Sequence, residues 1–230
     1  MNANVSRGLI VALLAASPAA AGEPAVVELY TSQGCAACPP ADALLAELAE
    51  REDVIALGLH VDYWDHLGWT DGFALAPNVT RQRRHAARLG EAMVFTPQMV
   101  IGGVRSLVGS RREEVMQALA RESAQDYPAR VALSGDARSL KIVVEGPAER
   151  EGRVLLASWS GPERVEVAAG ENEGRALTYA NVVRLWTELG EWRGGRAEFE
   201  APAPMDAAGA AALVEDPETG RILGAARWTP

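Results

Sequence analysis

Cysteine is scarce in this chain: its 230 residues include only two, Cys35 and Cys38, and both fall inside one Cys-x-x-Cys motif. A network of structural disulfides is therefore excluded, because no further cysteine exists to pair across the fold. A disulfide that closes so short a loop removes little entropy from the unfolded chain, so a purely stabilising role is a poor use of it. The pair favours redox or metal chemistry, with an inert local disulfide as the alternative.

Long apolar runs and an excess of positive charge are also missing. The first apolar stretch, Leu9 to Ala16, is far shorter than the roughly 20 residues that a membrane span needs, and no later stretch approaches that length. The 22 Lys and Arg residues are outnumbered by 31 Asp and Glu, giving a net charge of -9. An acidic chain is a poor binder of polyphosphates, which argues against nucleic acid as a partner.

The N-terminus has the pattern of a secretory signal. Arg7 precedes the apolar stretch, and the small residues at positions 17–21 follow it, as they do before a signal-peptidase site. We expect residues 1–21 to be a signal peptide, and the mature protein to be periplasmic or secreted with no membrane span after cleavage. No cysteine lies at the presumed cleavage site, which argues against a lipid anchor. An uncleaved N-terminal anchor is the alternative.

The stretch from Val26 to Leu48 organises the N-terminal half. A β-prone apolar run ends in a glycine turn, the Cys-x-x-Cys follows, and a helical pattern begins at once. A helix N-terminus presents free backbone N–H groups and the positive end of the helix dipole, which favour a thiolate at Cys35. Cys35 is therefore the expected nucleophile, and Cys38, one helical turn later, is the expected resolving thiol.

Strand and helix patterns alternate after the motif. The predicted elements are a helix over 39–50, a buried central strand over 54–61, an ordered loop over 62–77 and a helix over 78–89. On the last of these, Arg81, Arg84 and Arg88 recur at helical spacing and make one basic face. That face is either solvated or a docking face for an acidic partner.

A Thr96-Pro97 step interrupts the next strand-like region, and Gly102-Gly103 then forms a hairpin turn. A proline inside a strand pattern requires an edge, a bulge or a cis bond. After a short strand to Val108, the sequence Ser110-Arg111-Arg112-Glu113 fits a capping box at the start of another helix.

This order of strand, Cys-x-x-Cys, helix, strand, helix, strand, Thr-Pro, strand and final helix resembles a thioredoxin or glutaredoxin fold. More closely, the chain resembles an uncharacterised bacterial family of secreted thioredoxin-like proteins, domain of unknown function 1223. The segments that carry this resemblance are Glu-Leu-Tyr-Thr-Ser-Gln-Gly-Cys, Cys-Pro-Pro-Ala-Asp, His-Val-Asp-Tyr-Trp-Asp, Phe-Thr-Pro-Gln-Met and, near residue 175, Gly-Glu-Asn-Glu-Gly-Arg-Ala-Leu-Thr-Tyr-Ala-Asn-Val-Val-Arg. It implies a fold but no known substrate.

The resemblance implies roles for three further residues. In the thioredoxin fold a cis-proline faces the disulfide and the preceding backbone pairs with the substrate, which implies these roles for Pro97 and Thr96. A trans proline at a strand edge is the alternative. A buried acid on the equivalent strand of thioredoxins assists proton transfer from the second cysteine, and Glu28, in an apolar strand, is the candidate here. A solvent-facing or ion-paired glutamate is the alternative.

The C-terminal half has a different pattern. Residues 122–129 lose the helical period and read as a linker, and about eight short β-like runs with turn residues between them follow. The predicted fold is an α/β thioredoxin-like domain over 23–121, followed by an all-β sandwich-like domain over 130–230. The second half contains no cysteine and no histidine, so we interpret it as a binding or scaffold module.

These features predict an exported thiol-disulfide oxidoreductase that acts on thiols or disulfides of envelope or secreted proteins, with no cofactor and no bound metal. The sequence does not name its redox partner. One alternative is a copper or zinc chaperone, in which a histidine joins the two cysteines; the candidate is His60, which clusters with Asp62 and His66. A second alternative is a non-catalytic envelope interaction protein that keeps the fold as a scaffold.

Overall fold

The computed structural model describes residues 23–136 and 138–230, so the predicted signal peptide lies outside the described residues. The elements of the first half are β1 (Ala25–Thr31), α1 (Pro39–Ala49), β2 (Val54–His60), the 3-10 helix η1 (Asp65–Leu67), α2 (Ala76–Leu89), β3 (Gln98–Ile101), β4 (Arg105–Val108) and α3 (Arg112–Ser123). Those of the second half are β5 (Arg130–Gly135), β6 (Ser139–Gly146), β7 (Gly152–Ser160), β8 (Glu163–Glu166), β9 (Ala176–Tyr179), β10 (Val182–Trp192), β11 (Gly195–Pro202), β12 (Gly209–Glu215) and β13 (Ile222–Trp228).

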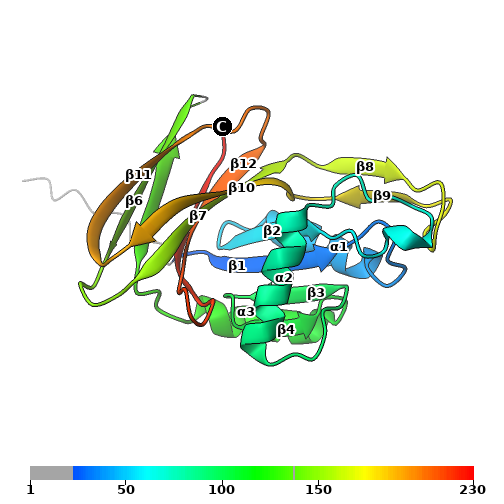
Figure 1. Cartoon of the computed structure of the whole chain (residues 1–230), viewed down its shortest axis with the longest axis horizontal. Helices are drawn as coiled ribbons and strands as arrows, with labels where there is room; N and C mark the ends of the chain where they lie inside the picture. The colour runs from blue at the N-terminus through cyan, green and yellow to red at the C-terminus, as the bar shows by residue number, and fades with distance from the viewer. Residues whose placement is uncertain (1–22, 137) are drawn as a thin grey trace, which may run out of the picture.

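One mixed sheet of eight strands runs through the molecule in the order β13-β12-β7-β10-β2-β1-β3-β4. β2 is parallel to both β1 and β10, and the other neighbours in this sheet are antiparallel. A second sheet, β11-β6-β5, packs against the β7, β12 and β13 end of the first one, and β8 pairs with β9 in a separate ribbon (Figure 1). The two sheets enclose a core that includes Leu140, Ile142 and Trp192.

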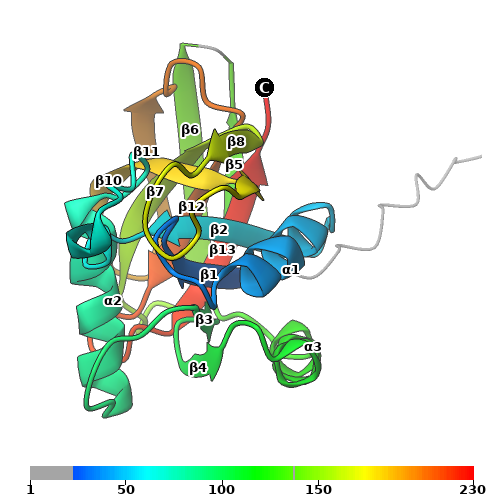
Figure 2. The same cartoon turned by 90° about the vertical axis from the view of Figure 1, so that its right-hand side faces the viewer.

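Helices cover both faces of the sheet at its β1 and β2 end. Figure 2 shows α2 on one side of these strands, and α1 and α3 on the other. Every residue of β1 and β2 is buried, as expected for strands covered on both faces. Alternate residues divide between the two cores, because successive side chains of a strand point to opposite faces. Val26 and Tyr30 pack on the α2 side, whereas Val27 and Leu29 pack on the α1 side.

The predicted fold class, an α/β thioredoxin-like domain followed by an all-β sandwich-like domain, is wrong. Of the described residues 42% are strand and 19% helix, and the large mixed sheet takes strands from both halves of the chain. The physical reason is a single contact region where β10 meets β2. The Gly58 N–H donates to the Asn181 carbonyl at 2.9 Å, and the Asn181 side chain donates to the Ala56 carbonyl at 2.9 Å. No local sequence pattern predicts this strand pairing, because its partners are more than a hundred residues apart in the chain.

Local boundaries differ from the predicted ones at two helix starts. α2 begins at Ala76, two residues before the expected cap at Asn78, and its N-cap is Leu75. The predicted capping box at Ser110 does not form, because the N-cap of α3 is Arg111 and makes no side-chain cap hydrogen bond. Within residues 23–136 and 138–230, no helix is both long enough and apolar enough to cross a membrane.

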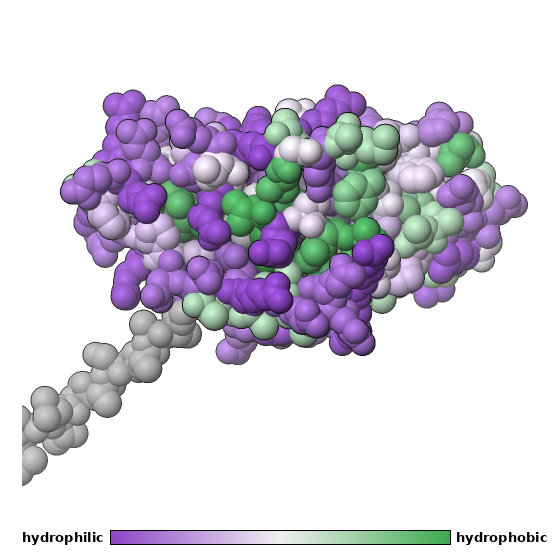
Figure 3. All heavy atoms as spheres, turned by 90° about the horizontal axis from the view of Figure 1, so that it is seen from below, coloured by the Kyte–Doolittle hydropathy of each residue, from purple (hydrophilic) through white to green (hydrophobic). Residues whose placement is uncertain are grey.

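Apolar surface gathers in the middle of the face seen from below and is interrupted by hydrophilic residues (Figure 3). In the described part of the chain, the large apolar side chains that are most exposed come from separate segments: Leu67, Met93, Leu185 and Met205. Single exposed apolar side chains of this kind are ordinary on a protein surface.

Candidate functional site

The two cysteines form a disulfide at the start of α1, with their Cα atoms 5.4 Å apart. Cys38 is the N-cap of the helix, and its N–H donates to the Cys35 carbonyl at 3.1 Å. The predicted order of strand, cysteine pair and helix is confirmed. Pro39 and Pro40, at the first helical positions, have no N–H group to donate to a cysteine sulfur. The helix therefore acts on the cysteines mainly through its dipole.

Both cysteines are buried, Cys35 with 1% and Cys38 with 0% of its surface exposed, although Ala36 and Ala37 between them are exposed. The cover comes from the loop at 167–175, which joins β8 to β9 and is called the β8–β9 loop below. The side-chain amide of its Asn172 donates to the carbonyls of Gln33 and Cys35, each at 2.9 Å. A segment of the C-terminal half therefore closes over the motif.

Thr96 and Pro97 are connected to the motif through Trp64. The indole Nε1 of Trp64 donates to Thr96 Oγ1 at 2.8 Å, and a Cβ added to Gly34, next to Cys35, would meet the Trp64 Cβ at 3.1 Å. The Thr96-Pro97 bond is cis. The structure thus brings the Thr-Pro step and the cysteine pair to the same region of the molecule.

The loop after β2 holds the backbone just before the cysteines. Asp71 accepts a hydrogen bond from the Gln33 N–H at 2.8 Å, and Trp69 donates to the Gln33 side chain at 2.8 Å. The same Asp71 carboxylate pairs with His60 Nδ1 at 2.7 Å. Burial opposes the charged form of Asp71, but the hydrogen bond and charge of His60 bring its pKa below the ordinary value.

Several buried polar side chains lie together beneath α1, and we call them the buried polar cluster. Its members are Thr31, Asp42, His60, Asp71 and Tyr179. The His60 ring packs edge-on against Tyr179, with centroids 4.6 Å apart. Asp42 is 5% exposed and lies one helical turn after Cys38, on the same face of α1. Burial raises the pKa of Asp42 to about 7. Its carboxyl group therefore exchanges protons near neutral pH.

Asp42 was not among the residues predicted for the site. At helical spacing, Asp42 falls opposite the apolar stripe of Ala41, Leu44, Leu45 and Leu48, which indicates a solvated side chain, whereas the structure buries it. The spacing of four residues from Cys38 is the signal that identifies it in retrospect, since residues four apart share a helix face. Asn172 has no comparable signal, because it lies 137 residues after Cys35 in the chain.

Glu28 lies on the other face of the sheet. Its carboxylate accepts hydrogen bonds from Arg81 at 2.6 and 3.0 Å, pairs with His85 at 3.0 Å and accepts the Tyr30 hydroxyl at 2.9 Å. Burial opposes its charge, but Arg81 and His85 together hold the pKa of Glu28 well below its ordinary value. The structure therefore does not bring Glu28 to the cysteines, and it has the ion-paired arrangement that we considered as the alternative.

Neither His60 nor His66 forms its hydrogen bond with a cysteine sulfur atom. His60 is fully buried and bonded to Asp71, and His66 Nδ1 lies 2.9 Å from the Tyr63 carbonyl. Across the described ranges, no group of three or more His, Cys, Asp or Glu side chains has an arrangement suited to a metal ion. The copper or zinc alternative gains no support from this geometry.

Fold and site together define a mostly β protein with a buried Cys-x-x-Cys disulfide at a helix start. The chain belongs to the family of proteins of unknown function called DUF1223, which matches residues 26–215. No curated protein matches the chain.

The solved structures that are similar to the chain include the following two. One is the crystal structure of protein AGR_C_4864 from Agrobacterium tumefaciens, with 29% sequence identity, a TM-score of 0.79, and coverage of 90% of this chain and 95% of that one. The other is HBP35 of Porphyromonas gingivalis, with 14% identity, a TM-score of 0.57, and coverage of 90% and 75%. The second likeness is one of fold alone.

Proposed function

We propose that this protein exchanges disulfides with other exported proteins through Cys35 and Cys38. The observation that carries the proposal is the disulfide between the chain's two cysteines at the start of α1, where a helix dipole and an ionisable carboxyl group both lie nearby. The likeness of the Cys-x-x-Cys and Thr-Pro segments to the thioredoxin and glutaredoxin superfamily supports the chemistry. Export and the periplasmic or secreted location belong to the same proposal.

In the reducing direction, the Cys35 thiolate attacks a partner disulfide, which forms a mixed disulfide and releases one partner thiolate. Cys38 then loses its proton and attacks the Cys35 sulfur, so the bond to the partner breaks and the second partner thiolate leaves. Two electrons pass to the partner, and its thiolates take up the two protons that the cysteines gave up. The same steps in reverse oxidise a partner dithiol.

Asp42 is the acid that we propose as acceptor of the Cys38 proton. The carboxyl group lies one turn along α1, and a pKa of about 7 lets it take up and release a proton at neutral pH. Glu28, which we expected in this role, stays ionised in its pair with Arg81. We therefore assign proton acceptance to Asp42.

A partner reaches the disulfide only when the β8–β9 loop moves away from it. The loop is held to the motif by the two hydrogen bonds of Asn172 and by the Ala36 N–H, which donates to the Glu171 carboxylate at 3.3 Å. Three hydrogen bonds are few enough for the loop to open locally before disulfide exchange. Displacement of the loop is thus part of partner recognition.

The test is a redox titration of the mature protein in glutathione buffers, followed by trapping of Cys35–Cys38 thiols. We expect a reduction potential between about -120 and -270 mV, the range of known oxidoreductases. A Cys38→Ser variant is expected to accumulate a mixed disulfide between Cys35 and a peptide whose cysteine is activated as a disulfide. A Cys35→Ser variant is not expected to accumulate one.

A disulfide that stays oxidised in every glutathione buffer would overturn the proposal. It would leave the second alternative, a scaffold with an inert disulfide, which the burial of both cysteines favours. Equal trapping by the two serine variants would overturn the assignment of Cys35 as the nucleophile.

A further inference from the structure

A pocket of about 480 Å³ opens between the first half of α2 and the strands β7 and β10. Its lining includes Arg81 and Arg84 of α2, Arg153 and Leu155 of β7, and Trp186 of β10. The volume is in the range of sites for small organic molecules. None of these residues contacts the cysteine motif in the structure, so the pocket is separate from the disulfide site.

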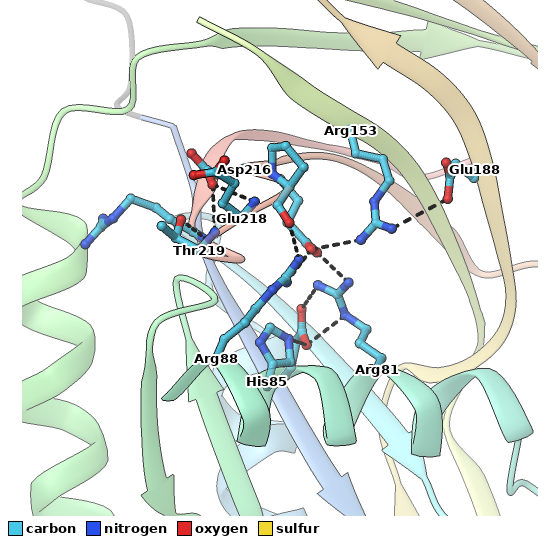
Figure 4. A network of polar contacts seen from close by, with 12 residues as sticks. Arg81, His85, Arg88, Arg153, Glu188, Asp216, Glu218 and Thr219 are labelled. Atoms are coloured by element: carbon cyan, nitrogen blue, oxygen red, sulfur yellow. Dashed lines mark hydrogen bonds and ion pairs between the residues drawn. The ribbon is translucent and has the colours of Figure 1, made fainter. Parts of the chain in front are cut away.

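Arg81 and Arg153 of the pocket lining belong to a network of charged side chains (Figure 4). Its centre is Glu215, which is fully buried and accepts hydrogen bonds from Arg81 at 2.6 Å, Arg88 at 2.8 Å and Arg153 at 2.9 Å. Arg81 also pairs with Glu28. These carboxylates hold the arginines in place before any ligand arrives.

Positive charge exceeds negative charge at the pocket. Arg81, Arg84 and Arg153 line the pocket together with Glu188, which is 3.7 Å from Arg153 and has 59% of its side chain exposed. Behind them lie Arg88 and the buried carboxylates of Glu28 and Glu215. Four positive groups therefore stand against three negative ones. Charge of this kind in a concave site favours an anion.

Arg84 is the guanidinium without a carboxylate. Among the described residues it has no ion pair or hydrogen bond, and the charges that act on it are those of Arg153, Glu215, Arg88 and Arg81. Burial, and next the charge of Arg153, lower its pKa. On the opposite wall, the Nε of Arg153 is buried and has no hydrogen-bond partner in the described structure. Arg84 therefore has hydrogen-bonding capacity free for a ligand, whereas this Nε of Arg153 is enclosed by protein.

The rest of the lining includes apolar side chains and the start of α2. Leu155 and the flat face of Trp186 line one side, and Trp186 is fixed by a hydrogen bond to Asn78 at 3.0 Å and by the Arg81 guanidinium 4.8 Å from its ring centre. Ala76 in the first turn of α2 also lines the pocket, which places the positive end of the helix dipole there.

We propose that this pocket binds a small organic anion, in which a carboxylate lies between Arg84 and Arg153 and a planar apolar group lies against Trp186 and Leu155. Arg84, which has no carboxylate partner, and Arg153, which is 3.7 Å from the exposed Glu188, recognise the carboxylate by charge-assisted hydrogen bonds. The indole recognises the planar group by stacking. This binding does not depend on exchange at the disulfide.

The test uses benzoate as the probe and benzamide, which has the same shape without the charge, as its neutral counterpart. Both are titrated into the mature oxidised protein by isothermal titration calorimetry. We expect benzoate to bind and benzamide to bind at least about tenfold more weakly, because the charged hydrogen bonds are lost. An Arg84→Gln variant is expected to lose benzoate affinity by about tenfold or more.

The matched control is Arg83→Gln, which removes an exposed arginine from the next position of the same helix. It is expected to bind benzoate within about twofold of the wild type, because Arg83 does not line the pocket. Arg84→Lys, which keeps the charge, is expected to retain more affinity than Arg84→Gln. Absence of benzoate binding, equal binding of benzamide, or equal losses in the Arg83 and Arg84 variants would each overturn the proposal.

Discussion

Asp42 is a carboxylic acid that α1 buries beside the disulfide, and its raised pKa makes the stability of the fold depend on pH. Between the ordinary value of 3.8 and about 7, the folded chain keeps the proton of Asp42 and the unfolded chain has lost it. The unfolded state then binds fewer protons, so stability falls as pH rises through this window, by up to about 1.4 kcal/mol per pH unit from this group.

An Asp42→Asn variant removes this dependence. We expect it to gain stability relative to the wild type as pH rises from 5 to 8, by roughly a few kcal/mol in total, when urea unfolding of the oxidised proteins is compared at each pH. An Asp62→Asn variant serves as the control, since Asp62 is exposed. If the two variants differ from the wild type by constant amounts at all pH values, the buried carboxyl is not protonated as we describe.

Single residues also show which parts of the candidate site can be predicted from the sequence. Cys35 and Cys38 are predictable because the motif itself carries the chemistry, and Thr96 and Pro97 because a proline in a strand is unusual. Glu28 and Asp42 are both acids with apolar neighbours in the sequence, and the sequence alone does not show which of them lies on the same side of the sheet as the cysteines. That choice depends on strand and helix phase in the assembled sheet.

The β8–β9 loop is the element that controls access to the disulfide. Asn172 holds it through two backbone carbonyls, and its own Oδ1 accepts a hydrogen bond from Arg175 at 2.8 Å. An Asn172→Ala variant loses all three bonds, and the carbonyls of Gln33 and Cys35 lose a buried donor. We expect the disulfide to be reduced by dithiothreitol several-fold faster than in the wild type.

The rate is measured by quenching with a thiol label that shifts the mass of the reduced protein. Glu173→Ala, an exposed substitution in the same loop, is the matched control and is expected to react at the wild-type rate. If Asn172→Ala and Glu173→Ala react equally, another element limits access to the disulfide.

Helix α2 illustrates why the position of a helix in the sequence is easier to predict than the contacts of its side chains. Its length follows from local periodicity, but its arginine face, expected to be solvated or to dock an acidic partner, is partly buried. Arg81 reaches Glu28, 53 residues earlier, and Glu215, 134 residues later. Burial of a charge requires partners in space, and a single sequence gives no distance between segments so far apart.

The same limit applies to the whole molecule. About eight strands were predicted for the C-terminal half, because alternation and turn residues are local signals, and nine form, β5 to β13. The joining of both halves in one sheet was not foreseen. The joint depends on Gly58, where a strand without a Cβ lets another backbone approach, and on Asn181, whose φ of 46° is in the left-handed region.

At the scale of the whole molecule, the shared sheet predicts that both halves unfold together. All described helices of four or more residues lie between Pro39 and Ser123, so helical circular dichroism reports the first half. Four of the six tryptophans lie in the second half, so fluorescence reports mainly that half. We expect both signals to show one urea transition with the same midpoint.

A Gly58→Val variant tests this joint directly. Even a Cβ on Gly58 would meet the Ala180 carbonyl oxygen at 3.0 Å, so the larger side chain forces β2 and the start of β10 apart. We expect a loss of about 1–3 kcal/mol that lowers both midpoints equally. Gly72→Val is the control, because nothing lies within 4 Å of a Cβ added there. Separate midpoints, with only one of them shifted by Gly58→Val, would instead show two independently folding domains joined by a weak contact.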